Sequence, residues 1–175
     1  MQEKIEKIAR AIRTVPDFPK EGIQFKDITP LLAEAKLFAE TIECFRETIS
    51  DKSIQVVAGI ESRGFIFGAA LALQLGVGFI PIRKPGKLPY KTFRQEYALE
   101  YGTDALEIHQ DAVENGQKVL LIDDLLATGG TALAAAKLIE QCGGEVVAIR
   151  FLIELDFLKG RDRLKAYDVQ TLIHF

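Results

Sequence analysis

The chain has 175 residues, of which 48% are hydrophobic and 27% are charged, and its formal net charge is -3. This length supports one hydrophobic core of ordinary size, and the slightly acidic balance gives no sign of a nucleic-acid-binding surface. Residues 1–13 are charged throughout, unlike a signal peptide, and no apolar run approaches the ~20 residues of a membrane span, so we expect a cytoplasmic protein that binds neither nucleic acid nor membranes.

Residues 1–30 predict a helix followed by a loop. Apolar residues recur with helical spacing from Ile5 to Ile12, and Pro16 stops the helix. The following residues to Pro30 contain too many turn formers for a helix, so we interpret them as an extended loop. A second helical pattern fills residues 31–49.

A strand–loop–helix–strand unit occupies residues 54–82. The apolar run 54–60 predicts a strand buried on both faces, the polar loop 61–64 follows it, and a helix over 65–75 leads to a strand at 77–82. Such units form an α/β fold in which helices cover both faces of a parallel sheet. Ligands bind at the carboxyl ends of these strands, so the loop 61–64 is a candidate site.

The most informative unit begins with the apolar strand 119–122. It ends in two carboxylates, Asp123 and Asp124, after which a loop rich in Thr and Gly leads into a helix over 132–142. The glycines of this loop let a ligand approach the main chain, and the start of the helix offers free N–H groups. The order is therefore strand, acidic pair, small-residue loop and helix.

This arrangement predicts a phosphate site beside a sugar site. The hydroxyl groups of Thr128 and Thr131 add donors to the N–H groups that hold a phosphate. Ionised Asp123 and Asp124 only accept hydrogen bonds, which suits them to sugar hydroxyls or to a magnesium shell. The implied ligand carries a phosphate at one end and hydroxyls in its middle.

Three other interpretations of this unit compete. An apolar strand ending in acids also occurs in P-loop ATPases, but no glycine of this chain is followed by Lys and then by Ser or Thr. A dinucleotide-binding loop needs a third glycine after Gly76 and Gly78, and Pro81 stands in its place. A purely structural turn is the third alternative.

Residues 84–101 are a second candidate functional segment, because basic and aromatic residues alternate there with prolines and little core pattern. One interpretation is a solvated hairpin. The other is a mobile basic loop that neutralises a leaving group and excludes water. We expect further strands at 103–108 and 145–155 and an edge strand at 169–175.

The two cysteines and two histidines give no metal signature. Cys44 and Cys142 lie in helical patterns with apolar neighbours, so we expect free buried thiols. His109 and His174 are too isolated in the sequence to predict a metal cluster. The charged residues 161–163 are interpreted as surface charge.

The segment Leu-Leu-Ala-Thr-Gly-Gly-Thr at residues 125–131 resembles the phosphoribosyl pyrophosphate (PRPP) signature of the type I phosphoribosyltransferases, and its wording is similar to that of the members that use adenine. Further similarities follow in the same order along the chain, at residues 16–19, 22–30, 59–65, 83–89 and 99–102. The resemblance is specific and covers nearly the whole chain.

The resemblance implies a single domain over residues 1–175. Residues 1–30 would form a helix and a small hood over the base, and residues 31–175 a core with a mobile loop at 84–101. The implied reaction is the Mg²⁺-dependent transfer of the phosphoribosyl group of PRPP to adenine, which gives AMP and pyrophosphate in purine salvage. The family is usually dimeric, so a homodimer is expected.

The resemblance also implies roles for the matched residues. Asp123 and Asp124 would hold the ribose and favour the cationic sugar, and Glu100 would be the acid/base that takes the purine proton. The other binding residues are Ala127, Thr128, Gly129, Gly130 and Thr131 for PRPP and AMP, Arg63, Lys84 and Lys87 for pyrophosphate, and Gln24, Phe25, Lys26 and Leu125 for adenine. Mg²⁺ would be held mainly by substrate and water near the two aspartates, with no certain protein ligand. From the sequence pattern alone, Glu96 and Glu107 are alternatives to Glu100.

Two other functions stay open. A nonenzymatic sensor of PRPP or purines could share this fold, but such regulators carry an added DNA-binding segment or an RNA-facing basic surface, and this chain has neither to spare. A transferase for xanthine or guanine is the second alternative, because recognition of the base through main-chain groups leaves no side-chain code to read.

Overall fold

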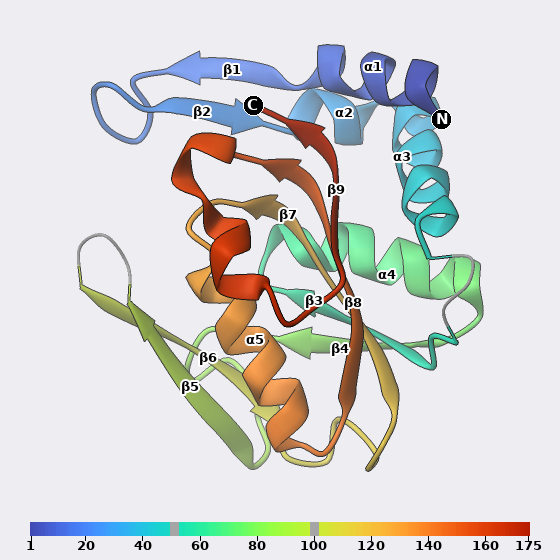
Figure 1. Cartoon of the computed structure of the whole chain (residues 1–175), viewed down its shortest axis with the longest axis vertical. Helices are drawn as coiled ribbons and strands as arrows, with labels where there is room; N and C mark the ends of the chain where they lie inside the picture. The colour runs from blue at the N-terminus through green and yellow to red at the C-terminus, as the bar shows by residue number, and fades with distance from the viewer. Residues whose placement is uncertain (50–52, 99–101) are drawn as a thin grey trace. The chain divides into compact units, whose positions relative to one another are not determined.

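The computed structural model describes residues 1–49, 53–98 and 102–175. By the contacts within it, the chain divides into two compact units, Met1–Thr48 and Ile49–Phe175. Figure 1 shows the elements of each unit in chain order. None of the helices in the described ranges has both the length and the apolar character that a membrane crossing needs.

The first unit contains three helices and a two-stranded hairpin. The elements are α1 (Gln2–Ala11), β1 (Arg13–Pro16), β2 (Gln24–Asp27), α2 (Thr29–Ala33) and α3 (Ala35–Glu47). The predicted opening helix is confirmed. The extended loop predicted up to Pro30 is wrong in part, because β1 and β2 pair antiparallel with Val15 opposite Phe25. The helix predicted over 31–49 is interrupted at Glu34, whose backbone is extended at φ -98° and ψ 103°.

The second unit is built on a sheet of five parallel strands among the described residues, in the order β4-β3-β7-β8-β9. The strands are β3 (Val56–Ile60), β4 (Gly78–Ile82), β7 (Lys118–Leu126), β8 (Glu145–Glu154) and β9 (Val169–His174). The predicted parallel sheet is confirmed, and β9 is the edge strand that the sequence indicates. Every residue of β3 is buried, as expected of a strand covered on both faces.

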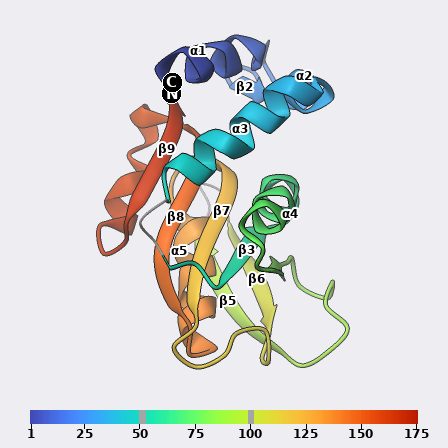
Figure 2. The same ribbon diagram turned by 90° about the vertical axis from the view of Figure 1, so that its right-hand side faces the viewer.

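Helices cover both faces of this sheet, as Figure 2 shows. Helix α4 (Arg63–Leu75) packs on β3, β4 and β7, and α5 (Gly130–Gln141) packs on β7 and β8. Gly76 ends α4 in the left-handed conformation at φ 69°, which glycine adopts without steric cost. The chain therefore winds outward in opposite directions from β3 and β7, and the order of the strands reverses between these two.

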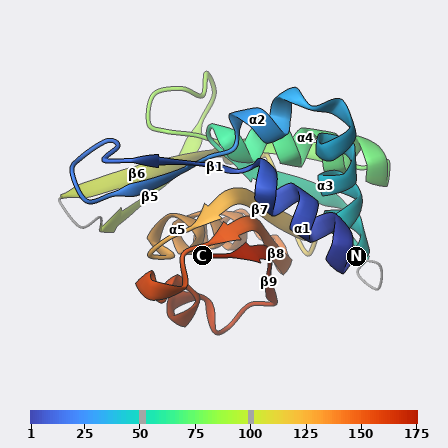
Figure 3. The ribbon, with the colours of Figure 1, turned by 90° about the horizontal axis from the view of Figure 1, so that it is seen from above.

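An antiparallel hairpin packs against α5 and also contacts β4 at the edge of the sheet. It consists of β5 (Thr92–Ala98) and β6 (Thr103–His109), and it projects outward in Figure 3. The hairpin interpretation is confirmed for residues 92–98, which pair with β6, and the mobility of the segment 84–101 stays a prediction. Strand β6 follows the prediction for 103–108.

The connection from β8 to β9 contains two short 3-10 helices, η1 (Asp156–Leu158) and η2 (Gly160–Leu164). Lys159 joins them in the left-handed conformation at φ 52°. The sequence predicts neither helix, because segments this short carry no periodic pattern. Cys44 and Cys142 are free thiols, as expected, although Cys142 is only half-buried.

Candidate active site

A cavity of about 660 Å³ opens at the carboxyl ends of β3 and β7, where the strand order reverses. This is where ligands bind in sheets of this class, and the volume suits a small molecule. Its walls come from the loop after β3, from the end of β7 with the loop that follows, and from β8 with η1. The described lining residues are Glu61, Ser62, Arg63, Asp123, Asp124, Leu125, Leu126, Ala127, Thr128, Gly129, Thr131, Ala132, Phe151 and Leu158.

The acidic pair lies inside β7 and not after it. The sequence predicts that the strand ends before Asp123, but its pairing with β8 continues as far as Leu126. The apolar pattern stops at Asp123 because the strand enters the polar cavity there, while the backbone ladder goes on. The pairing also sets Asp123 beside Phe151 of β8, which brings that aromatic ring to the cavity wall.

An ion pair joins the two main walls of the cavity. Arg63 Nε lies 2.8 Å from Oδ2 of Asp124, whose side chain is only 6% exposed. The main-chain N–H of Asp124 donates to Oδ1 of Asp123 at 2.9 Å. Burial raises the pKa of each aspartate above the ordinary value of an aspartate. The charge of Asp124 raises the pKa of Asp123 further, whereas the charge of Arg63 lowers the pKa of Asp124 and so opposes the effect of burial there. Such perturbed carboxylates in a cavity mark a functional site.

The loop after β7 has the geometry of an anion site. Gly129 caps α5 in the left-handed conformation at φ 79°, which a residue with a side chain adopts at a cost. The helix starts at Gly130, two positions before the predicted start, and its first N–H groups have no partner within the helix. The side chains of Thr128 and Thr131 line the same end of the cavity. These donors can hold a phosphate together with the helix dipole.

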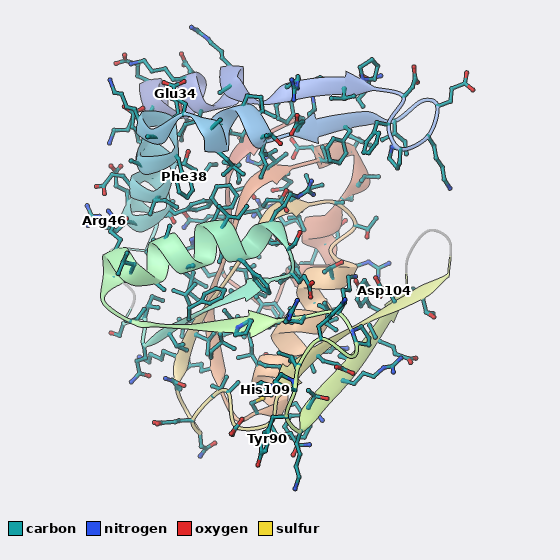
Figure 4. All side chains as sticks on the ribbon, turned by 180° about the vertical axis from the view of Figure 1, so that it is seen from behind. Glu34, Phe38, Arg46, Tyr90, Asp104 and His109 are labelled. Carbon is teal, nitrogen blue, oxygen red and sulfur yellow. The ribbon has the colours of Figure 1, made fainter. Side chains whose placement is uncertain are left out.

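Of the three basic residues expected at pyrophosphate, the described cavity lining includes Arg63 but neither Lys84 nor Lys87. Lys84 Nζ pairs with the carboxylate of Asp104 and donates to the hydroxyl of Tyr97 at 2.9 Å. Figure 4 labels Asp104 on the β5–β6 hairpin. The main-chain carbonyl of Lys87 accepts from Arg83 Nη1 at 3.0 Å. The lysines therefore lie in the segment next to the hairpin in this conformation.

Glu61 and Arg83 form a clamp that the sequence did not reveal. Arg83 donates to both carboxylate oxygens of Glu61 at 3.1 Å, and the main-chain N–H of Lys84 donates to the same carboxylate at 3.0 Å. The Arg83 hydrogen bonds lower the pKa of Glu61. This bidentate pair fixes the start of the basic segment to the end of β3.

Two apolar wall residues, Phe151 and Leu158, were not among the predicted site residues. A parallel sheet places the end of β8 at the right edge, but only the register of β7 with β8 picks out Phe151. No sequence signal indicates Leu158, which lies in η1. Leu125, predicted to contact adenine, does line the cavity.

The other residues expected at adenine belong to the first unit. Gln24, Phe25 and Lys26 form most of β2. The ring of Phe25 meets Phe18 edge to face, with centroids 5.1 Å apart, and Lys26 Nζ donates to Thr14 at 3.1 Å. Their role at the base stays a prediction. Glu100, the expected acid/base, lies outside the described residues.

Outside the cavity, one expectation about a charged residue needs correction and a second is confirmed with an addition. His174 is not isolated, because its Nδ1 lies 2.8 Å from Asp156 Oδ1 and 3.8 Å from Glu154 Oε2. Arg161 is exposed, as expected of surface charge, and it also pairs with the buried Glu154. Glu154 also accepts from the Thr171 hydroxyl at 2.8 Å, so its oxygens are already engaged in hydrogen bonds.

Comparisons with known proteins agree with this geometry. Residues 25–175 match the family model "Phosphoribosyl transferase domain". The adenine phosphoribosyltransferase of Thermotoga petrophila is 57% identical over 95% of this chain and 98% of its own length. The crystal structure of adenine phosphoribosyltransferase from Thermoanaerobacter pseudethanolicus has a TM-score of 0.96 at 57% identity and covers 98% of this chain and 99% of that chain. The Saccharomyces cerevisiae enzyme, crystallised with an imino-altritol bisphosphate and adenine, has a TM-score of 0.94 at 43% identity over 98% of this chain and 99% of that chain.

Proposed function

The chain belongs to the phosphoribosyltransferase family, among the adenine phosphoribosyltransferases, and we propose that it transfers the phosphoribosyl group of PRPP to adenine, releasing pyrophosphate and giving AMP. It is a pentosyltransferase of purine salvage. The observation that supports this most directly is that a helix start suited to anions, the half-buried Asp123 and the buried Asp124 line one cavity where the strand order of the sheet reverses.

The residues of the cavity suit this reaction. The loop 127–131 anchors the 5-phosphate through N–H and hydroxyl donors. Departure of pyrophosphate leaves positive charge on the ribose, and the carboxylates of Asp123 and Asp124 stabilise that charge in a site of low dielectric. Arg63 neutralises pyrophosphate from the opposite wall. The reaction then needs positioning and charge, and no covalent intermediate with the protein.

Mg²⁺ belongs to the proposal, and the donors near the ribose site fit it. Carboxylate oxygens are the hard ligands that Mg²⁺ prefers, and Asp123 and Asp124 supply them at the cavity wall. Since Arg63 already occupies Oδ2 of Asp124, substrate and water would provide most of the ligands. The bound ion would neutralise charge on the pyrophosphate.

The finer assignments concern residues that are not part of the described cavity lining. Glu100 accepts the proton that adenine loses as the glycosidic bond forms, and Gln24, Phe25 and Lys26 hold the base. Lys84 and Lys87 complete the pyrophosphate site, which requires Lys84 to exchange Asp104 for the phosphate oxygens. We further expect a cytoplasmic homodimer that binds neither nucleic acid nor membranes, in keeping with the formal charge of -3.

Thermal-shift measurements with PRPP and Mg²⁺, alone and with adenine, guanine or xanthine, test the proposal together with an assay of pyrophosphate release. We expect PRPP to stabilise the protein, and we expect pyrophosphate release with adenine but not with guanine or xanthine. Release with guanine or xanthine in place of adenine would assign a different base. Stabilisation without any release would make the protein a sensor.

A further inference from the structure

We infer that Gly160 and Arg161 position the phosphate loop: Gly160 supports the main chain of Ala127–Gly129 from behind, and Arg161 holds Gly160 in place. The inference rests on the proposed function, since it assigns residues of η2 to the phosphate half of that site. Neither residue is among the described lining residues of the cavity, so both act through the loop.

The first observation is a close packing of two main chains. Gly160 is buried, and a β-carbon at this position would overlap the carbonyl oxygen of Ala127 and lie 3.0 Å from the nitrogen of Gly129. In the other direction, a β-carbon at Gly129 would overlap the carbonyl oxygen of Gly160 and lie 3.1 Å from its carbonyl carbon. The two backbones therefore meet without space for a side chain on either, and a change at residue 160 must displace the loop or η2.

The second observation is the anchor of the next residue. Arg161 donates from Nε to Glu154 Oε1 at 3.1 Å, from Nη1 to the carbonyl of Val169 at 2.7 Å, and from Nη2 to the Thr171 hydroxyl at 3.2 Å. Its Nη2 also pairs with Glu154 Oε2. The guanidinium fork thus ties η2 to both β8 and β9 in a fixed orientation, which a single ammonium group does not provide.

The anchor of Arg161 is also connected to β7, the strand that leads into the phosphate loop. Glu154, only 4% exposed, stands opposite Leu126 in the β7–β8 register, and the main-chain N–H of Leu155 donates to the Leu126 carbonyl at 3.0 Å. Leu126 directly precedes the phosphate loop. The loop is consequently held at its start by β8 and from behind by Gly160. Both supports depend on β8, through the Leu155 hydrogen bond and through the pairing of Arg161 with Glu154.

This support matters because donors must be held in place to stabilise a phosphate. A misplacement of about 1 Å caused by a distant change can lower activity about 100-fold. If the contact were merely structural, its loss would lower stability and would change the affinities for PRPP and adenine by the same factor. A positioning role instead predicts a loss that is selective for PRPP.

The test compares Arg161→Gln, Arg161→Lys and Gly160→Ala with a control, Lys165→Gln. Lys165 belongs to the same segment and pairs with Asp162, but both side chains are well exposed, at 76% and 62%. For each protein, thermal melting, the Kd of PRPP and of adenine by calorimetry, and kcat and KM for both substrates are measured below the melting temperature.

We expect Arg161→Gln to raise the KM and Kd of PRPP about 10- to 100-fold with little change for adenine, Arg161→Lys to lie between it and wild type, and Lys165→Gln to match wild type. Wild-type PRPP affinity in folded Arg161→Gln overturns the inference, as does an equal loss for both ligands. If Gly160→Ala does not fold, the PRPP affinity of Arg161→Gln still tests the inference. Failure of the wild-type protein to bind PRPP or release pyrophosphate would instead overturn the proposed function.

Discussion

Arg63 and Asp124 form an ion pair between the first residue of α4 and the interior of β7, with 2.8 Å between Nε and Oδ2. The arginine side chain is 36% exposed and the aspartate 6% exposed, so the guanidinium is the partner that can turn toward a ligand. It compensates the charge of Asp124, the more buried of the two adjacent carboxylates. Under the proposed function, a turn of Arg63 toward pyrophosphate would withdraw that compensation and increase the negative charge beside the ribose.

The first prediction concerns both carboxylates. Asp123→Asn and Asp124→Asn should fold and lose most turnover, because each removes negative charge that stabilises the cationic sugar. The expected cost in activation free energy is on the order of 2 to 4 kcal/mol, by comparison with other electrostatic catalytic groups. Single-turnover rates at saturating PRPP measure it, with the exposed Asp111→Asn as the control. Near-normal rates in both variants would remove the acids from the mechanism.

The second prediction follows from the raised pKa of Asp123. A carboxyl whose pKa is raised on folding contributes stability that is complete below its unfolded pKa and is lost as pH rises through the folded pKa. At pH 7.5 the ligand-free Asp123→Asn variant should thus be more stable than wild type by on the order of 1 kcal/mol, or about 2–4 °C in Tm. The difference should shrink in melts at pH 5. A lower Tm of the variant at pH 7.5 would contradict this.

The third prediction concerns the phosphate loop. Gly129→Val and Thr131→Val should weaken PRPP binding more than adenine binding, because the first disturbs a left-handed residue packed on Gly160 and the second removes a hydroxyl donor. Calorimetry with each ligand measures the effect. Gly116→Val is the matched control, since Gly116 has a similar φ of 76° but open space around it. The control should lose stability and keep its PRPP affinity. Unchanged PRPP binding in both loop variants would place the phosphate elsewhere.

The fourth prediction concerns the proton of the purine. Glu100→Gln should lower turnover ~100-fold to ~10,000-fold, remove the acidic limb of the pH profile and leave PRPP binding nearly intact. Glu96→Gln is the comparison, because the Glu96 side chain is 66% exposed and pairs with Arg94 in β5. If Glu100→Gln retains wild-type turnover and Glu96→Gln does not, the acid/base is Glu96.

The fifth prediction concerns the clamp between Glu61 and Arg83. The pKa of Glu61 is lowered in the folded protein. Glu61 therefore contributes stability at pH values above its unfolded pKa, and this stability is lost as the pH falls through the folded pKa. Glu61→Gln should cost on the order of 1 kcal/mol at pH 7, because hydrogen bonds between charged groups are weakened while solvent screens part of the effect. Urea unfolding at pH 7 and pH 3.5 measures both values, and the cost should fall at the lower pH. An equal cost at both pH values would contradict the role of the charge.

The sequence predicted the parts of the fold that a local pattern encodes. The apolar runs of β3 and β7 marked strands covered on both faces, and Gly76 marked the end of α4. The hairpin of β1 and β2 escaped prediction, because each strand has only four residues and forms only by pairing with the other. Such short strands show too little alternation to distinguish them from a loop.

For the site, the sequence indicated the two acids and the loop after β7, which line the cavity, because these residues are contiguous in the chain. It could not locate Phe151, which depends on register, or the pairing of Arg63 with Asp124, which depends on the packing of the start of α4 against β7. The packing of Gly160 against Gly129 was equally hidden. Both glycines are visible in the sequence, but only the tertiary structure shows that each excludes a side chain from the other.

The parallel pairing of β3 with β7 has a consequence for the order in which the chain acquires its function. Val56 can pair with Val119 only after the ribosome has synthesised α4, β4 and the β5–β6 hairpin, which lie between them in the sequence. The phosphate loop can pack against Gly160 only after that residue has been synthesised as well. Pairings over such long sequence separations form slowly, because the loop between them must close first. During translation, a nascent chain that has reached Thr131 contains every residue of the PRPP signature and still lacks the surface against which that signature is held. We therefore expect PRPP binding to require the segment that carries Gly160, so PRPP binding can serve as a probe of a late stage of folding.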